Sequence, residues 1–400
     1  MCGIFVYIRK LKNMNRIILV GNGFDLAHGL KTSYKDFISW YWTDCGDRLL
    51  HCHNKIEADG LTSFKLINNF DIIWSNVWGY RYHRNNPLRP WDLNEVVRLA
   101  KEDKDLCDFS FTSPLLKRVW DKLLLGWVDI ENEYFSLLTE KDQPQIVESF
   151  GFDRLNYKEL NNQLDVLRNK LIQYLKCESE KTTPIIDNIN DIIYRPIEQR
   201  EISVAYKRLL GENLTGDVAP CATMLLNFNY TKTPEMYLSE SSNVVVNYIH
   251  GCLENPESVI FGYGDELDSD FKKLQNMNDN ECMRHIKSIR YLESDSYRKM
   301  LKFIESDSFQ IIILGHSCGL SDRTLLNTLF EHKNCVSIKP YYYINEQGKD
   351  NYLDIVQNIS RNFTNPQLMR DRVVNKTYCE ELPQVTRNKR KRSDGSSLLA

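Results

Sequence analysis

The sequence predicts an α/β fold in which a largely parallel, Rossmann-like sheet carries a large helical insertion. Two continuous apolar runs, 17–20 and 311–314, have the composition of strands that are buried on both faces. A long charged and aromatic stretch with helical periodicity lies between them, and strand-like runs return only after residue 221. Strands separated by helices are typical of βαβ units, which build parallel sheets.

The elements follow one another along the chain in a simple order. The first strand, 17–20, runs into Gly21-Asn22-Gly23, and a helical pattern follows from about Ser33 through Trp42. Helices are then expected at 92–103, 114–141 and 154–177, and strands at 224–228, 244–249, 259–261, 311–314 and 336–338. Ligands of parallel sheets bind at the carboxyl ends of the strands, and the polar motifs of this chain all follow strands.

These patterns divide the chain into four parts. The core comprises 14–44 and 221–365, and the helical insertion comprises 45–220. Residues 1–13 form an N-terminal extension that has the charges on the wrong side for a signal peptide. Residues 366–400 are expected to be a basic, disordered tail, because five Lys and Arg residues lie within 387–392.

The composition excludes several classes of protein. A net charge of -3 argues against a general nucleic-acid binder, and no apolar run is long enough to span a membrane. The eleven cysteines include no CxxC pair, and His51-Cys52-His53 lacks a second ligand pair at metal spacing, so no metal is expected. Scattered thiols of this kind fit a reducing, cytoplasmic environment.

The first motif is the glycine segment Gly21-Asn22-Gly23-Phe24-Asp25, which continues to Gly29. Glycines let a backbone approach a phosphate closely, and the N-terminus of a following helix favours negative charge. The segment is not the dinucleotide fingerprint, because Leu26 occupies the place of the third glycine. A tight structural turn is the alternative, with Asp25 either capping the helix or binding a ribose hydroxyl.

Two further motifs end strands. Asn227 and Asn229 are two residues apart, so they point the same way from a strand and suit sugar hydroxyls, a carboxamide or a water. The alternative is a turn in which asparagine bonds its own backbone. His250 precedes Gly251 at the end of the next strand, where it is either a structural residue or a proton acceptor near neutral pH.

The last two motifs are also strand ends. The segment from Gly262 to Glu266 forms either a turn with a solvated acidic edge or a wall of the pocket. Gly315-His316-Ser317-Cys318-Gly319 matches the serine-hydrolase elbow, but the only downstream histidine is His332, about one helix length away. A second loop that faces a phosphate or ribose is therefore the preferred interpretation, with Gly315, His316 and Ser317 as its residues.

Taken in order, these motifs resemble the AbiH family of phage abortive-infection proteins. The likeness is most specific in the 25 residues from Asn15 and covers about 14–365. Its further elements are the helical segment from Trp127 to Glu131, and 227–231, 249–251 and 315–317. The resemblance implies a role in antiviral defence.

The same order of motifs is similar, more distantly, to the sirtuin-like NAD-consuming fold. That likeness implies that the loop from Gly21 to Gly29, with Asp36-Phe37, holds a pyrophosphate and that Asn229 lies near the nicotinamide ribose. It implies His250 as the catalytic histidine and 315–317 as the adenosine-ribose loop. Asn22, Asp25 and Thr231 depart from the sirtuin pattern, and the zinc module is absent, which disfavours protein deacylation.

The leading hypothesis is therefore an abortive-infection effector that hydrolyses NAD or a related nucleotide. Asn229 and His250 are the expected catalytic residues, and Glu131 either reaches the site or only forms a helix face. The expected ligand-binding residues are Gly21, Asn22, Gly23, Phe24, Asp25, Gly29, Asn227, Gly262, Gly315, His316 and Ser317. A nucleotide-binding sensor without catalysis is the alternative, and a nuclease is disfavoured because no acidic metal site has recognisable spacing. A phage component as trigger and a homo-oligomer are the partners considered, besides the nucleotide.

Overall fold

The protein is described here from a computed structural model, and its chain divides into two compact units. The structure describes residues 14–50, 56–66, 107–123, 129–139, 156–210, 216–240 and 242–385. The described residues of the first unit lie within Met1–Thr32, Leu175–Asp279 and His285–Ala400, and those of the second within Ser33–Tyr174 and Asn280–Arg284. The predictions for 1–13, 51–53, 92–103, Trp127 and 387–392 lie outside the described residues.

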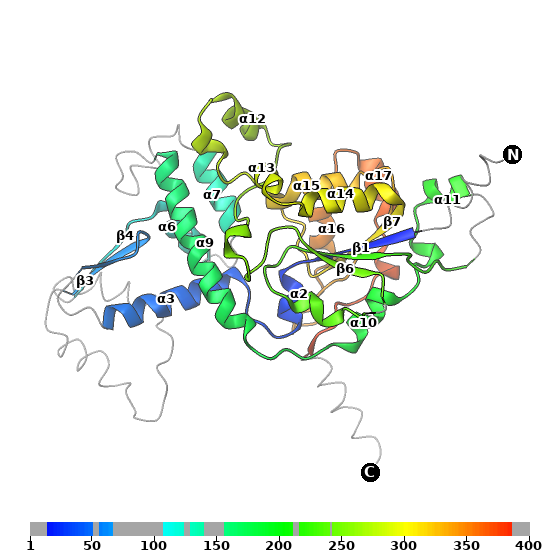
Figure 1. Ribbon diagram of the computed structural model, residues 1–400, viewed down its shortest axis with the longest axis horizontal. Helices are drawn as coiled ribbons and strands as arrows, with labels where there is room; N and C mark the ends of the chain where they lie inside the picture. Colours follow the sequence, from blue (N-terminus) through cyan, green and yellow to red (C-terminus); the bar gives the residue numbers. More distant parts are fainter. Residues whose placement is uncertain are drawn as a thin grey trace, which may run out of the picture. The chain divides into compact units, whose positions relative to one another are not determined.

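The first unit is built on a five-stranded parallel sheet with the order β6-β5-β1-β7-β8 (Figure 1). Its strands are β1 (Met14–Val20), β5 (Thr223–Asn227), β6 (Val244–Tyr248), β7 (Ser308–Leu314) and β8 (Cys335–Pro340). From β1 the chain adds β5 and β6 on one side and then β7 and β8 on the other, so the order reverses between β1 and β7. The predicted α/β fold with a Rossmann-like parallel sheet is confirmed, whereas its sirtuin-like variant stays a prediction.

The strand register brings the carboxyl ends of four strands to one level. Val20 of β1 is paired with Asn227 of β5 and with Leu314 of β7. Asn227 is in turn paired with Tyr248 of β6. The loops that follow these strands therefore leave the same edge of the sheet.

Both faces of the sheet are covered, which explains the continuous apolar runs. Ile17 and Leu19 pack in one core with α14 (Ser296–Ser306), α15 (Arg323–Phe330) and α16 (Tyr352–Arg361). Ile18 and Val20 pack in another with α2 (Asn22–Ala27) and α10 (Asp187–Tyr194). Figure 1 shows α14 and α15 on one side of the sheet and α2 and α10 on the other. Each fully buried side chain of this size contributes about 1.5–3 kcal/mol.

Residues 366–385, expected from the sequence to begin a disordered tail, contain regular structure. They form α17 (Pro366–Arg372) and the 3₁₀ turn η10 (Lys376–Tyr378), and they bury Val374 and Leu382. Glu380 accepts a hydrogen bond of 3.3 Å from Lys339 of β8, which also binds Glu201 at 2.5 Å. The prediction of disorder is therefore wrong for residues 366–385, where Glu380 helps to neutralise the fully buried Lys339.

The second unit is not purely helical, contrary to the prediction for the insertion. It contains an antiparallel sheet of β2 (Ile56–Ala58), β3 (Thr62–Leu66) and β4 (Cys107–Phe111). Its helices within the described ranges are α3 (Tyr34–Leu50), α6 (Pro114–Leu123), α7 (Ile130–Thr139) and most of α9 (Tyr157–Ser179). The expected boundaries at 45 and 220 differ from the division at 33 and 174.

The first unit contains three further α-helices in the described ranges. They are α11 (Val204–Leu210), α12 (Ser269–Asn276) and α13 (Lys287–Arg290). The strand expected at 259–261 does not form, and Ile260 instead donates its N–H to the carbonyl of His250 at 2.9 Å. That bond still ties this segment to the loop after β6.

Candidate functional site

The loops after β1, β5, β6 and β7 contact one another at the carboxyl edge of the sheet. Asn229 Nδ2 in the loop after β5 donates to the Gly21 carbonyl at 2.9 Å. The Phe228 ring lies 5.2 Å from the ring of His250 and 4.1 Å from that of His316, centroid to centroid. The structure thus brings together residues that are up to about 300 positions apart in the sequence.

The glycines of the first and last loops permit a close approach of two backbones. Gly23 donates its N–H to the Gly315 carbonyl at 2.8 Å. A Cβ on Gly21 would lie 2.5 Å from the His316 Cα, and a Cβ on Gly315, which has φ +76°, would lie 2.2 Å from the Phe24 nitrogen. The turn at the switch point between β1 and β7 is therefore interlocked by its glycines.

This packing uses backbone groups that a phosphate loop would offer to a ligand. The N–H of Gly23 bonds Gly315, and the N–H of Phe24 bonds the carbonyl of Gly21 at 2.9 Å. The glycines are explained by contact between loops, and α2 is only six residues long. Phosphate binding by Gly21, Gly23 and Phe24 stays a prediction that these contacts do not favour.

Asp25 is a buried carboxyl beside the loop after β5. Its Oδ2 accepts a hydrogen bond of 2.6 Å from the Thr231 hydroxyl, while Oδ1 has no hydrogen-bond partner in the described chain. Burial raises the pKa of Asp25 to about 6, partly offset by Thr231, Thr233 and Asn229. The group therefore changes charge close to neutral pH.

The two asparagines have different roles, because β5 ends at Asn227 and only that residue belongs to the strand. Asn227 is fully buried, donates to the Thr231 carbonyl at 2.9 Å and accepts the Asn229 N–H at 3.1 Å. It holds its own turn, as the structural alternative predicted. Asn229 is half-buried and spans to the loop after β1.

A cluster of charged and polar groups surrounds Asp322, the last residue of the turn η9 (Leu320–Asp322). Lys287 Nζ lies 2.8 Å from Asp322 Oδ1, and His250 Nε2 lies 3.2 Å from the same oxygen. His316 Nε2 lies 3.6 Å from Oδ2. The Tyr291 hydroxyl is 3.1 Å from His250 Nε2. All five side chains are buried.

The charges in this cluster oppose the effect of burial on Asp322. Burial alone would raise the pKa of Asp322, but Lys287 and then His250 and His316 hold it well below its ordinary value. Burial and Lys287 lower the pKa of His250, and Asp322 only partly offsets them. At neutral pH the cluster therefore contains an ionised Asp322 and a neutral His250.

The loop after β7 is fixed by hydrogen bonds within the loop and from residues at the end of α16. The Cys318 N–H donates to His316 Nδ1 at 3.0 Å, and Cys318 has a left-handed backbone with φ +55°. Asn358 of α16 and Asn362, which caps the end of that helix, donate to the carbonyls of Ser317 and Cys318 at 2.8 and 2.9 Å. This strained turn fixes the orientation of the His316 ring.

The segment with Gly262 positions Lys287. Tyr263 donates its N–H to the His285 carbonyl at 3.0 Å and accepts the Lys287 N–H at 2.9 Å. A Cβ on Gly262 would lie 1.9 Å from the His285 oxygen, so glycine is required for this pairing. Asp265 is not part of a solvated edge: it is buried and binds Arg323 at 3.0 Å.

Other expected site residues lie at the margin or elsewhere. Asn22, Gly29 and Ser317 are exposed, and no atom lies within 4 Å of the position that a Cβ on Gly29 would take. His332 bonds Glu305 at 3.2 Å and stacks near Phe309 at the amino end of β7, so it is not a triad partner for Ser317. Asp36, Phe37 and Glu131 belong to the second unit.

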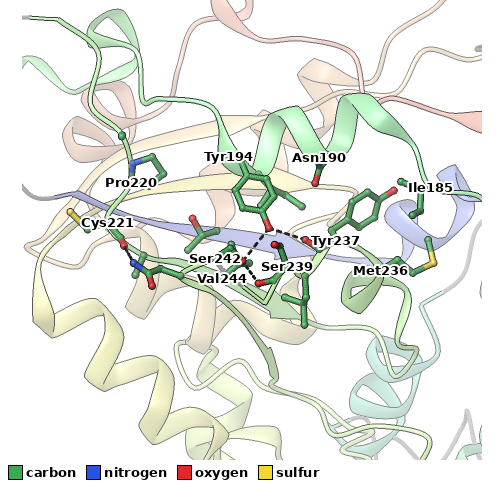
Figure 2. Close-up of a pocket in the computed structure, with 16 residues that line it drawn as sticks. Ile185, Asn190, Tyr194, Pro220, Cys221, Met236, Tyr237, Ser239, Ser242 and Val244 are labelled. Atoms are coloured by element: carbon green, nitrogen blue, oxygen red, sulfur yellow. Dashed lines mark hydrogen bonds between the residues drawn. The ribbon is translucent and has the colours of Figure 1, made fainter.

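Figure 2 shows a groove of about 680 Å³ at the other end of the sheet. It borders Thr223 and Val244, the first residues of β5 and β6. In this groove the Tyr194 hydroxyl is within hydrogen-bonding distance of the Tyr237 carbonyl, at 3.0 Å, and of the Ser242 hydroxyl, at 3.3 Å. None of the predicted site residues lines this groove.

Sequence patterns missed Lys287, Tyr291 and the role of Asp322. Lys287 and Tyr291 are in short helical turns without a motif, and only the pairing of 263 with 285–287 brings them to the site. Asp322 lies in the same loop after β7 as His316, so its place after a strand was the signal that could have found it. The described residues contain no group of three or more His, Cys, Asp or Glu side chains that could hold a metal.

The fold and the loops define a class: a doubly wound α/β protein whose polar residues gather at the carboxyl edge near the switch point. The family model described as "Bacteriophage abortive infection AbiH" matches residues 17–343. The chain therefore belongs to the AbiH family of bacteriophage abortive-infection proteins. A search of curated proteins finds no match. Within the described part of the chain, no helix has the length and apolarity needed to cross a membrane.

Proposed function

We propose that this chain limits phage infection by hydrolysing NAD or a related nucleotide at the carboxyl edge of its sheet. The observation that carries the proposal is the 3.2 Å contact between His250 Nε2 and Asp322 Oδ1, beside the loop that contains Asn229. A histidine held by a carboxylate is a suitable general base near neutral pH. A phage component is the proposed trigger.

The chemistry requires water to replace the base at the anomeric carbon. The bond between C1′ and the pyridinium nitrogen breaks, and its electron pair neutralises the nicotinamide ring. A water oxygen forms the new bond to C1′, and its proton goes to His250. The products are nicotinamide and ADP-ribose, with no oxidant or metal needed.

Binding of the nucleotide is proposed to use the side chains that border the loops. Asn229 Oδ1 makes no hydrogen bond in the described chain, so it is available to a ribose hydroxyl or to water. Ser317 is exposed on the loop after β7 and suits a second ribose. Asp25 suits a ligand hydroxyl, because its Oδ1 is buried without a partner among the described groups.

The test is release of nicotinamide from NAD by the purified chain, followed by chromatography. His250→Gln should reduce the rate by about 100-fold or more. His332→Gln is the matched control, because His332 bonds Glu305 at the amino end of β7, and it should keep the rate. No nicotinamide release by the native chain, with or without extract of phage-infected cells, would contradict the hydrolysis.

The second candidate function is a sensor that binds a nucleotide without cleaving it. It is favoured by the burial of His250, which is only 4% exposed and so is shielded from a bound substrate. Tight retention of NAD without turnover would support it. So would intact phage defence in a His250→Ala variant.

A further inference from the structure

We infer that Asp322 and Lys287 act as a positioning pair for His250. Asp322 fixes the ring tautomer with the proton on Nε2, and Lys287 cancels the carboxylate charge so that the ring remains neutral. Nδ1 is then the nitrogen that accepts a proton. The consequence for turnover rests on the proposed function, but the tautomer and charge of His250 do not.

The tautomer follows from the bonding capacity of the partners. An ionised carboxylate only accepts hydrogen bonds, so a neutral ring is attracted to Asp322 Oδ1, 3.2 Å from Nε2, when Nε2 carries the proton. The Tyr291 hydroxyl, 3.1 Å from Nε2, can accept from the same N–H. His250 Nδ1 makes no hydrogen bond to a residue in the described ranges. Its lone pair is therefore available.

The tautomer of His316 follows from its partners in the same way, and its ring lies near the other oxygen of Asp322. Its Nδ1 accepts the Cys318 N–H, so in the neutral ring the proton is on Nε2, 3.6 Å from Asp322 Oδ2. Asp322 thus faces N–H groups from two rings and one ammonium. The negative charge of Asp322 and the positive charge of Lys287 therefore offset each other in this buried cluster.

Among the charges around His250, that of Lys287 has a larger effect on the pKa of the ring than that of Asp322, and Lys287 and His250 both contact Asp322 Oδ1. Lys287 Nζ is 2.8 Å from Asp322 Oδ1, and the lysine side chain is 1% exposed. The groups that face His250 are Asp322, Lys287, His316 and the Tyr291 hydroxyl. Protonating the ring would place a second cation beside a single buried carboxylate, which is unfavourable.

The test is nuclear magnetic resonance of the full chain labelled with ¹⁵N-histidine, with His250 assigned by the signals lost in His250→Gln. In the native chain at neutral pH we expect a non-protonated Nδ1 and a protonated Nε2. Lys287→Gln keeps a donor to Asp322 but removes the charge, so it should raise the pKa of His250 by about one to two pH units. A protonated Nδ1, or an unchanged or lowered pKa in Lys287→Gln, would overturn the inference.

Two further variants guard against loss of folding and against general charge effects. Lys287→Gln combined with Asp322→Asn removes both charges, so its His250 pKa should lie between those of the native chain and Lys287→Gln. This neutral pair also keeps the inference testable if the single variant unfolds. Lys273→Met removes an exposed lysine that is paired only along its own helix, and it should leave His250 unchanged.

The activity arm separates this inference from the proposed function. If NAD is hydrolysed, the acidic limb of its pH–rate profile should move to higher pH in Lys287→Gln, because the base must be neutral. If no NAD is hydrolysed but the resonances behave as expected, the positioning pair stands and the proposed reaction falls.

Discussion

At the scale of single residues, the site contains two buried carboxyls with opposite environments. Asp322 is surrounded by cationic and N–H groups, which hold its pKa well below the ordinary value. Asp25 has hydroxyl and amide neighbours, and burial raises its pKa to about 6. One acid is therefore ionised throughout the neutral range, while the other changes charge within it.

Asp25 should make stability depend on pH. Between about pH 4 and pH 6 its native carboxyl binds a proton that the unfolded chain has lost, so stability falls as pH rises through this window. Asp25→Asn removes the charge and should be more stable than the native chain at pH 7.5, by up to ~3 kcal/mol. Thermal unfolding followed by circular dichroism from pH 3 to pH 8 measures this.

The gain should disappear below about pH 4, where both chains carry a neutral group in both states. Asp350→Asn is a suitable control, because Asp350 is partly exposed and bonded to Lys376. An Asp25→Asn variant that is no more stable at pH 7.5 would contradict the uncompensated burial of Asp25.

At the scale of elements, the loops after β1 and β7 interlock. Gly315→Ala would place a Cβ 2.2 Å from the Phe24 nitrogen and 2.5 Å from the Gly23 carbonyl carbon at φ +76°. We expect a loss of more than ~2 kcal/mol in stability, because backbone atoms cannot move aside as a flexible side chain can. The shift of the thermal midpoint measures it.

Gly348 provides the matched control for this substitution. It has φ +81°, yet no atom lies within 4 Å of the position of an added Cβ. Gly348→Ala should therefore cost only the ~1 kcal/mol of the left-handed backbone. Equal losses in the two variants would mean that the loops do not interlock.

The elements also explain what could be predicted from the sequence. β1 and β7 are buried on both faces, so their apolar runs are continuous and easily found. β2 and β3 are three and five residues long and mix polar with apolar positions, so they were missed inside a helical region. The segment 373–385 was missed because its contacts are long-range: Glu380, for example, accepts a hydrogen bond from Lys339, about 40 residues away in the sequence.

Some residues of the candidate site could likewise be predicted from the sequence, and others could not. Asn229, His250 and His316 were found because each follows a strand, and a parallel sheet brings such positions to one edge. Lys287 could not be found, because it reaches Asp322 only through the pairing of Tyr263 with His285 and Lys287. Local patterns carry no information about that long-range contact.

At the scale of the whole molecule, the sheet order gives the fold class and the family match gives the family. The chain belongs to the AbiH family, and its first unit is a doubly wound sheet whose order reverses between β1 and β7. The groove of Figure 2 lies at the amino ends of β5 and β6, so a ligand found there would not be explained by the proposed chemistry. The central claim is that defence against phage depends on NAD cleavage with His250 as base.

The most direct test of that claim is the NAD content of bacteria infected by a phage against which the native chain protects. Cells with the native chain should lose most of their NAD after infection and release few phage. Cells with His250→Gln, at the same protein level, should keep their NAD and lose protection. Protection by the native chain while NAD remains undiminished would contradict the account.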